Sequence, residues 1–162
     1  MTNYFNESNW VYTVLATPFA KRQGTKWKYN DQKFLPLLTT LINNQDCVSE
    51  DRLNHASLID DVRYNNAQVQ RYRRNNLFDL EQSLTQTQSK NKWIITEGVF
   101  GMDGDIAPLP QLFHLAKNYD CQLLIDDAHG IGVLGKSGRG SIEYYQLPIK
   151  NASIVVGTFG KA

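Results

Sequence analysis

The stretch IDDAHGIGVLG (residues 125–135) decides the fold of this chain. It begins where a short apolar run, residues 121–125, ends, and it continues at once with carboxylates, an imidazole and glycines. An apolar run of this kind, bounded by a loop, is typical of a parallel strand that is buried on both faces. Ligands of open α/β sheets bind just beyond the carboxyl ends of such strands. We therefore expect Asp126, Asp127 and His129 to lie at a functional site.

Strand and helix patterns alternate along the rest of the chain. Strands are expected at residues 48–53, 68–72, 93–96, 121–125 and 154–156. Helices are expected at residues 34–42, 57–62, 78–84 and 109–116, with Pro36 in a first turn, Asn76 as an N-cap, and Pro108 and Pro110 opening the last helix. This alternation predicts an α/β fold with three layers, α/β/α, around a mostly parallel sheet.

The composition excludes several classes of protein. A chain of 162 residues has the size of one domain, and its 17 basic and 16 acidic residues nearly cancel, which argues against nucleic-acid binding. No apolar run approaches the roughly 18 residues of a membrane span, and the N-terminus does not resemble a signal peptide. Cys47 and Cys121 lie far apart, and Cys121 opens a strand, so we expect it to be a buried, reduced thiol. These features predict a soluble, cytoplasmic protein that does not bind membranes.

The N-terminal part of the chain is the hardest to interpret. Residues 11–20 are mildly apolar, whereas residues 21–33 are polar and basic, and neither segment has a clean helix or strand period. We therefore expect residues 1–34 to form a divergent, poorly ordered arm. Residues 35–162 then contain the folded domain.

The glycine-rich segment and the residues before it allow three interpretations. The first two are a dinucleotide-binding loop and a metal site. GIGVLG (130–135) has the glycine spacing of the dinucleotide-binding fingerprint, but other residues separate it from the strand, and residues 136–140 continue as a loop where a helix should open. Asp126, Asp127 and His129 also suit a divalent metal ion. Nothing else in the chain supplies a further ligand at a fixed spacing, so our predicted site contains no metal.

The third interpretation is a pyridoxal 5'-phosphate site. This cofactor needs an acid that keeps its pyridine nitrogen protonated, so that the ring acts as an electron sink. It also needs a lysine for a Schiff base, and it benefits from a flat side chain on the ring face. Asp126, Lys161 and His55 have the chemistry for these three roles. Since an isolated lysine is more often a solvated surface residue, the residues alone leave the interpretations open.

Four motifs together carry a resemblance to a known family. They are DRLNHAS (51–57), TEGVFGMDGD (96–105), DDAHG (126–130) and TFGK (158–161). Their order and register resemble the alpha-oxoamine synthases, which are pyridoxal phosphate enzymes of the aspartate aminotransferase fold. The resemblance implies that the chain contains part of the large, cofactor-binding domain of a fold-type I enzyme.

Two segments resemble one branch of this family. MDGDIAPL (102–109) and DDAHGIGVLG (126–135) are similar to the branch that makes 8-amino-7-oxononanoate in biotin biosynthesis. The resemblance implies an acyltransferase that condenses L-alanine with a pimeloyl thioester of coenzyme A or acyl carrier protein, with loss of carbon dioxide, as a homodimer. The alternatives are another alpha-oxoamine synthase, such as a 2-amino-3-oxobutyrate ligase, and a catalytically inactive remnant or interaction fragment.

The resemblance also implies a role for each matching site residue. Lys161 would hold the cofactor as a Schiff base and shuttle a proton. Asp126 would pair with the pyridinium nitrogen, and His129 would approach the phenolic oxygen. His55 would stack on the ring, and Thr158 would hydrogen-bond the phosphate.

This sequence departs from the family at several points. The resemblance begins near residue 35, so the glycine-rich region and the Ser-Gly-aromatic loop that the family carries before that point have no match. A family His-Asn-Asp appears as RNN (74–76), and a family serine near the phenolic oxygen appears as Gly101. Since the sequence stops just after Lys161, we expect the C-terminal domain to be absent and turnover to be weak or lost.

Overall fold

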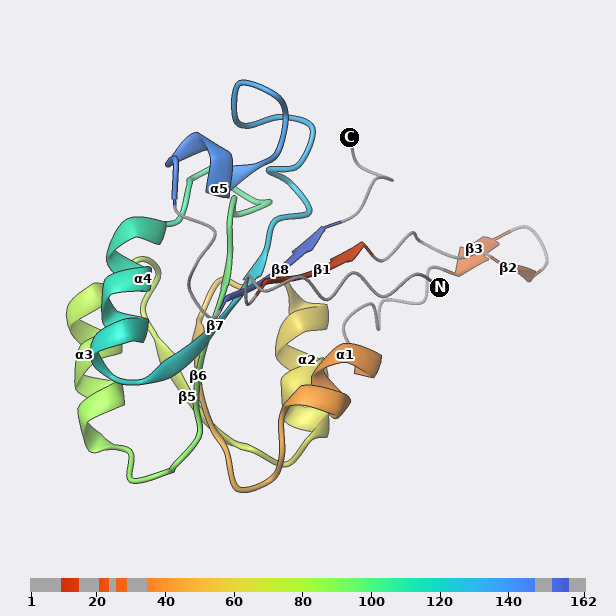
Figure 1. The fold of residues 1–162 in the computed structure, drawn as a ribbon. Helices are drawn as coiled ribbons and strands as arrows, with labels where there is room; N and C mark the ends of the chain where they lie inside the picture. Colours follow the sequence, from red (N-terminus) through yellow and green to blue (C-terminus); the bar gives the residue numbers. More distant parts are fainter. Residues whose placement is uncertain (1–9, 15–20, 24–25, 29–34, 148–152, 158–162) are drawn as a thin grey trace.

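A six-stranded parallel sheet forms the centre of the molecule (Figure 1). The computed structural model describes residues 10–14, 21–23, 26–28, 35–147 and 153–157. The strands are β1 (Trp10–Val14), β2 (Lys21–Gln23), β3 (Lys26–Lys28), β4 (Cys47–Asp51), β5 (Gln68–Tyr72), β6 (Lys92–Glu97), β7 (Cys121–Asp126) and β8 (Ser153–Gly157). The helices are α1 (Leu35–Leu41), α2 (Ala56–Tyr64), α3 (Leu77–Gln86), α4 (Leu109–Asn118) and α5 (Ser141–Tyr144). The sheet order is β1-β8-β7-β6-β4-β5, while β2 and β3 pair antiparallel.

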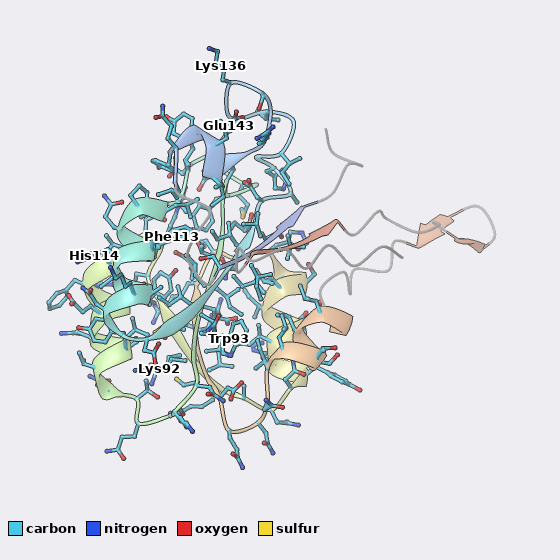
Figure 2. All side chains as sticks on the ribbon, in the orientation of Figure 1. Lys92, Trp93, Phe113, His114, Lys136 and Glu143 are labelled. Carbon is cyan, nitrogen blue, oxygen red and sulfur yellow. The ribbon has the colours of Figure 1, made fainter. Side chains whose placement is uncertain are left out.

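Both faces of the sheet are covered, which gives the predicted three layers. Ile94 packs in the core beside α3 and α4, whereas its neighbour Ile95 packs in the core beside α1 and α2. Figure 2 shows Phe113 on the first side of the sheet and Trp93 on the second. Since successive residues of a strand point to opposite faces, a strand that is buried on both faces, such as β8, is largely apolar. The apolar runs of the sequence therefore reflect double burial.

The helix boundaries follow the predicted signals. Asn76 caps α3, and its side chain accepts a hydrogen bond from the Asp79 backbone N–H at 3.0 Å. α4 begins directly after Pro108 and contains Pro110 in its first turn, where the missing N–H of proline costs no helical hydrogen bond. α1 likewise contains Pro36 in its first turn. These predictions are confirmed.

Three short segments of the N-terminal region, residues 10–14, 21–23 and 26–28, form strands in the described part of the chain. Residues 10–14 form β1, which pairs in parallel with β8 from Trp10 opposite Ser153 to Val14 opposite Gly157. Residues 21–23 and 26–28 form the short β2–β3 hairpin. The physical reason is that one side of β8 offers unpaired backbone groups, which a mildly apolar extended segment satisfies. The expectation of a poorly ordered arm over residues 1–34 stays a prediction.

Two further expectations concern the cysteines and the membrane. Cys47 and Cys121 are both buried free thiols, so the prediction for Cys121 is confirmed. None of the helices in the described part of the chain combines the length and the apolar character that crossing a membrane requires.

The strand order reverses between β4 and β6. From β4 the chain passes to β5 at one edge, and it then returns to β6 on the other side of β4 and continues through β7 to β8. The connections after β4 and β6 contain α2 and α4, which pack on opposite faces of the sheet. Such a reversal opens a crevice at the carboxyl ends of the two strands. The topology therefore places a site where β4 and β6 end.

Candidate functional site

The turn after β4 carries the first predicted side chain. His55 is the N-cap of α2, and its Nδ1 accepts a hydrogen bond from the Ser57 N–H at 3.3 Å. The same nitrogen lies 2.7 Å from Ser57 Oγ. These contacts fix the imidazole at the start of the helix although the residue is exposed. An exposed, oriented ring at the crevice has the shape that stacking on a cofactor needs.

A buried carboxylate at the end of β6 joins two loops. Glu97 Oε1 accepts a hydrogen bond from the His55 backbone N–H at 2.5 Å, and Oε2 accepts one from the Gly101 backbone N–H at 3.2 Å. The residue is only 3% exposed. Because one side chain accepts both N–H groups, it ties the turn after β4 to the turn after β6.

Asp126 lies beside this carboxylate. It ends β7, and its Cα pairs in register with that of Glu97 on one neighbouring strand and that of Val156 on the other. Residues in register on parallel strands point to the same face of the sheet, here the face of α1 and α2. Asp126 is 8% exposed, and its Oδ1 accepts a hydrogen bond from the Ala128 N–H at 3.0 Å. A nearly buried carboxylate in this place suits a positively charged ring nitrogen.

His129 reaches the same edge from the loop after β7. A Cβ placed on Gly101 would lie 2.6 Å from His129 Nε2, so the imidazole rests directly against this glycine. The side chain is half-buried. The departure from the family serine at position 101 thus leaves space that the imidazole uses.

Asp127 serves the loop and not the crevice. It is fully buried, and its Oδ2 accepts a hydrogen bond from the Ser141 N–H at 2.8 Å. A Cβ on Gly98, Gly130 or Gly140 would fall inside the contact distance of its carboxylate. Burial raises the pKa of Asp127 to about 6, and the Ser141 hydrogen bond opposes this shift. The side chain therefore fills the space between these glycines inside the loop.

The two competing interpretations of this segment find no support in the described residues. Within them, no group of three or more His, Cys, Asp or Glu side chains is arranged to hold a metal ion. The third glycine of GIGVLG, Gly135, has a φ of +86° and opens no helix, and the four-residue α5 begins only at Ser141. The context of a dinucleotide-binding loop is therefore missing.

A second set of contacts holds the turn after β6 from its exposed side. The Arg74 guanidinium forms ion pairs with Asp103 and Asp105, and it lies 5.2 Å from the centre of the Phe100 ring. This arginine stands at the position where the resemblance implies a histidine. The substitution therefore comes with its own set of partners in the loop.

Two predicted site residues, Thr158 and Lys161, lie outside the described residues. β8 ends at Gly157 beside β7, and the Asp127 N–H donates a hydrogen bond to the Val156 carbonyl at 2.7 Å. β8 thus ends next to Asp126. The proposed roles of Thr158 and Lys161 stay predictions.

The structure connects three of the five predicted side chains. His55 and Asp126 both adjoin Glu97, and Gly101 joins Glu97 to His129. Imidazole and carboxylate groups at one sheet edge suit the ring of pyridoxal phosphate. Sequence reasoning missed Glu97, although the rule that selects strand ends at this edge applies to it as well. The resemblance places both Gly101 and His129 near the phenolic oxygen, which agrees with their contact, although residue spacing does not predict it.

Comparison with known proteins agrees with the predicted resemblance. The pattern of the aminotransferase class I and II family matches residues 34–162. The chain is 48% identical over 128 residues to 8-amino-7-oxononanoate synthase from Nitrosococcus oceani, which covers 79% of this chain and 34% of the relative. The Sphingomonas wittichii serine palmitoyltransferase has a TM-score of 0.75 at 35% identity, over 81% of this chain and 33% of that chain. The Francisella tularensis 8-amino-7-oxononanoate synthase has a TM-score of 0.69 at 34% identity, over 82% and 38%. This chain therefore spans about a third of the length of these relatives.

Proposed function

Because the chain belongs to the aminotransferase class I and II family, we propose that it carries the cofactor-binding part of a pyridoxal phosphate-dependent acyltransferase. The proposed reaction condenses L-alanine with a pimeloyl thioester of coenzyme A or acyl carrier protein, and it releases carbon dioxide and the free thiol of the carrier to give 8-amino-7-oxononanoate. The cofactor of this family is pyridoxal 5'-phosphate, which when bound supplies an electron sink for the bond that breaks at the α-carbon.

One observation carries the proposal. Glu97 accepts the backbone N–H of His55, in the turn after β4, and it pairs in register with Asp126 at the end of β7, so both residues adjoin one carboxylate at the edge where the strand order opens a crevice. Both residues belong to motifs that match the alpha-oxoamine synthases. Position and residue type therefore agree on the same site.

Each predicted residue has a role that its chemistry supports. Asp126 would keep a proton on the ring nitrogen, because a carboxylate stabilises a positive charge beside it. His55 would offer a flat face to the ring, and His129 would hydrogen-bond the phenolic oxygen. Lys161 would attach the cofactor and act on the proton of the α-carbon, while Thr158 would hydrogen-bond the phosphate.

Assembly and location are part of the same proposal. The family forms homodimers, and two exposed apolar side chains, Met102 at 88% and Val133 at 68%, lie on loops at the site edge, where a second subunit would cover them. A biosynthetic role on small acids and thioesters fits a cytoplasmic location. Sedimentation of the purified chain at several concentrations tests for the dimer.

The test of the cofactor site uses the purified chain and a matched lysine. With pyridoxal phosphate the chain should develop a yellow absorption band, and borohydride should trap the cofactor on Lys161. Lys161→Ala should abolish the band and the trapped peptide, whereas Lys136→Ala, on the exposed tip of the loop after β7 (Figure 2), should change neither. Equal labelling of both variants would contradict the proposal.

A second assay tests the amino acid substrate. The purified chain should consume pimeloyl-coenzyme A in the presence of L-alanine, with a full-length 8-amino-7-oxononanoate synthase as the positive control. L-serine is the informative competitor, because a serine palmitoyltransferase gives the higher TM-score, 0.75 against 0.69. Glycine tests the ligase branch. Faster consumption with either competitor would move the assignment to another branch of the family.

A further inference from the structure

The carboxylate of Glu97 stands at the centre of the site although no predicted role uses it. Its two oxygens bind backbone N–H groups on different loops, His55 at 2.5 Å and Gly101 at 3.2 Å. The first loop carries the imidazole that is exposed at the crevice, and the second forms the surface against which the His129 imidazole rests. One side chain thus connects to both histidines through the backbone.

The surroundings of this carboxylate make the connection rigid. Glu97 is buried, and its own backbone belongs to β6, which pairs with β4 and β7 on its two sides. Because β4 and β7 hold β6 on both sides, the backbone of Glu97 at the end of this strand is fixed, and its carboxylate holds the two N–H groups relative to the sheet itself. The same strand position sets Glu97 beside Asp126, so the positions of both loops are fixed relative to that acid.

We propose that Glu97 is a positioning residue, whose carboxylate sets the places of the His55 and His129 imidazoles relative to Asp126. The proposal rests on the proposed function only for its effect on the cofactor; the link between the loops stands on the hydrogen bonds alone. Loss of the carboxylate frees two N–H groups in a nearly buried place, and the turns should shift to find other acceptors. Displacement of groups around a ligand by about 1 Å is enough to lower affinity or rate strongly.

The first measurement needs no cofactor. In Glu97→Ala, the backbone N–H groups of His55 and Gly101 should exchange with solvent about 10- to 100-fold faster, the effect expected for loss of hydrogen bonds to a charged acceptor. In Glu97→Gln, the single carbonyl oxygen retains one of the two bonds, so only one N–H should become fast. Glu81→Gln on α3, which also removes a carboxylate that accepts a hydrogen bond, here from Tyr119 at 2.9 Å, is the matched control.

The second measurement uses the three histidines of the chain. The imidazole NMR signals of His55 and His129 should both shift in Glu97→Ala, while that of His114, on the outer side of α4 (Figure 2), should stay in place. A merely structural role would disturb His114 as well or leave all three unchanged. If the signals of His55 and His129 remain in place in both variants, the proposal is wrong.

The third measurement tests whether Glu97 affects the binding of the cofactor. The dissociation constant of pyridoxal phosphate should rise about 10- to 100-fold in Glu97→Ala and less in Glu97→Gln, as for other residues that orient binding groups. An unchanged constant together with shifted imidazoles would overturn the claim that these positions matter. If the unaltered chain binds no cofactor, the proposed function fails, while amide exchange and the imidazole signals still decide the role of Glu97.

Discussion

Two loops leave the same edge of the sheet after neighbouring strands, and they are held in opposite ways. The loop after β6 is clamped from outside, where Arg74 forms ion pairs with the exposed side chains of Asp103 and Asp105. The loop after β7 is held from inside, where the fully buried Asp127 fills the space left by glycines and accepts the N–H of Ser141. Both loops border the proposed cofactor site.

The comparison shows how the contribution of an aspartate side chain to stability depends on its burial. Exposed ion pairs contribute little to stability, and salt screens them. A buried carboxyl group loses its hydration, which raises its pKa and makes each remaining hydrogen bond important. We call the contacts of Asp127 the inner clamp and the ion pairs of Arg74 with Asp103 and Asp105 the outer clamp. We therefore expect the stability contributed by the inner clamp to depend on side-chain shape and pH, and that contributed by the outer clamp to depend on salt.

The largest effect should come from adding one carbon inside the inner clamp. Gly140 has a φ of +83° and a ψ of −160°, a conformation nearly restricted to glycine, and its Cβ would collide with the Asp127 carboxylate. Gly140→Ala should lower the free energy of unfolding by about 4 kcal/mol, the sum of backbone strain and overpacking. Urea unfolding measures this change.

Gly104 provides the matched control for that substitution in the outer loop. It also has a positive φ, +74°, but nothing lies within 4 Å of the position of its Cβ. Gly104→Ala should therefore cost only about 1 kcal/mol, the strain term alone. If Gly140→Ala and Gly104→Ala lower the free energy of unfolding equally, the close packing around Asp127 does not explain the loss.

The next effect should come from removing the inner clamp itself. Asp127→Ala deprives the Ser141 N–H of its acceptor and leaves a hole between the glycines. The free energy of unfolding should fall by about 2 kcal/mol, since an unpaired buried donor costs roughly 1 to 3 kcal/mol. Asp103→Ala, which removes one partner in the outer loop, should cost well under half as much. Thermal and urea unfolding of both variants decide the ranking.

The pH dependence of the inner clamp follows from its raised pKa. Burial raises the pKa of Asp127 to about 6, above the ordinary value of 3.8, so the folded state binds a proton more tightly than the unfolded chain. The contribution of this group to stability is therefore complete below about pH 4 and is lost as the pH rises to 6. The slope approaches at most about 1.4 kcal/mol per pH unit.

Asp127→Asn isolates this contribution, because the amide keeps the shape and the oxygen that accepts the Ser141 N–H, but it does not titrate. The stability difference between the unaltered chain and the variant should change between pH 4 and pH 6 and stay constant above pH 7. Taking the difference cancels other acids, such as Glu50, whose pKa burial raises to about 7. A constant difference from pH 4 to pH 8 would show that Asp127 titrates normally.

Much of this fold could be predicted because the central strands β6, β7 and β8 are mostly buried on both faces. Residues 121–125 and 154–156 predicted β7 and β8 closely, since double burial leaves an apolar run that loops do not imitate. β1 escaped prediction, because its pairing with β8 depends on a partner at the other end of the chain. The short α5 also escaped, because it has only four residues and follows a glycine-rich loop.

The sequence predicted the site only where its residues lie at or just after strand ends. Asp126 follows from its position at the end of a buried strand, and His55 and His129 follow from motifs of the family. The clamps do not follow in this way, since the ion pairs of Arg74 and the glycines around Asp127 depend on packing between separate loops. Their partners are set by the folded chain and not by spacing along the sequence.

The smallest effect should come from the outer clamp, and salt should make it smaller. Arg74→Ala removes both ion pairs and the contact with Phe100, and it should lower the free energy of unfolding by about 1 kcal/mol at low ionic strength. At 1 M salt, where the screening length falls to about 3 Å, the loss should shrink toward the part contributed by Phe100. Arg63→Ala, which breaks an exposed pair with Asp60 at 4.0 Å, is the control and should change stability by less at either salt concentration. If the loss in Arg74→Ala does not depend on salt while that in Asp127→Ala does, the assignment of outer and inner clamps must be reversed.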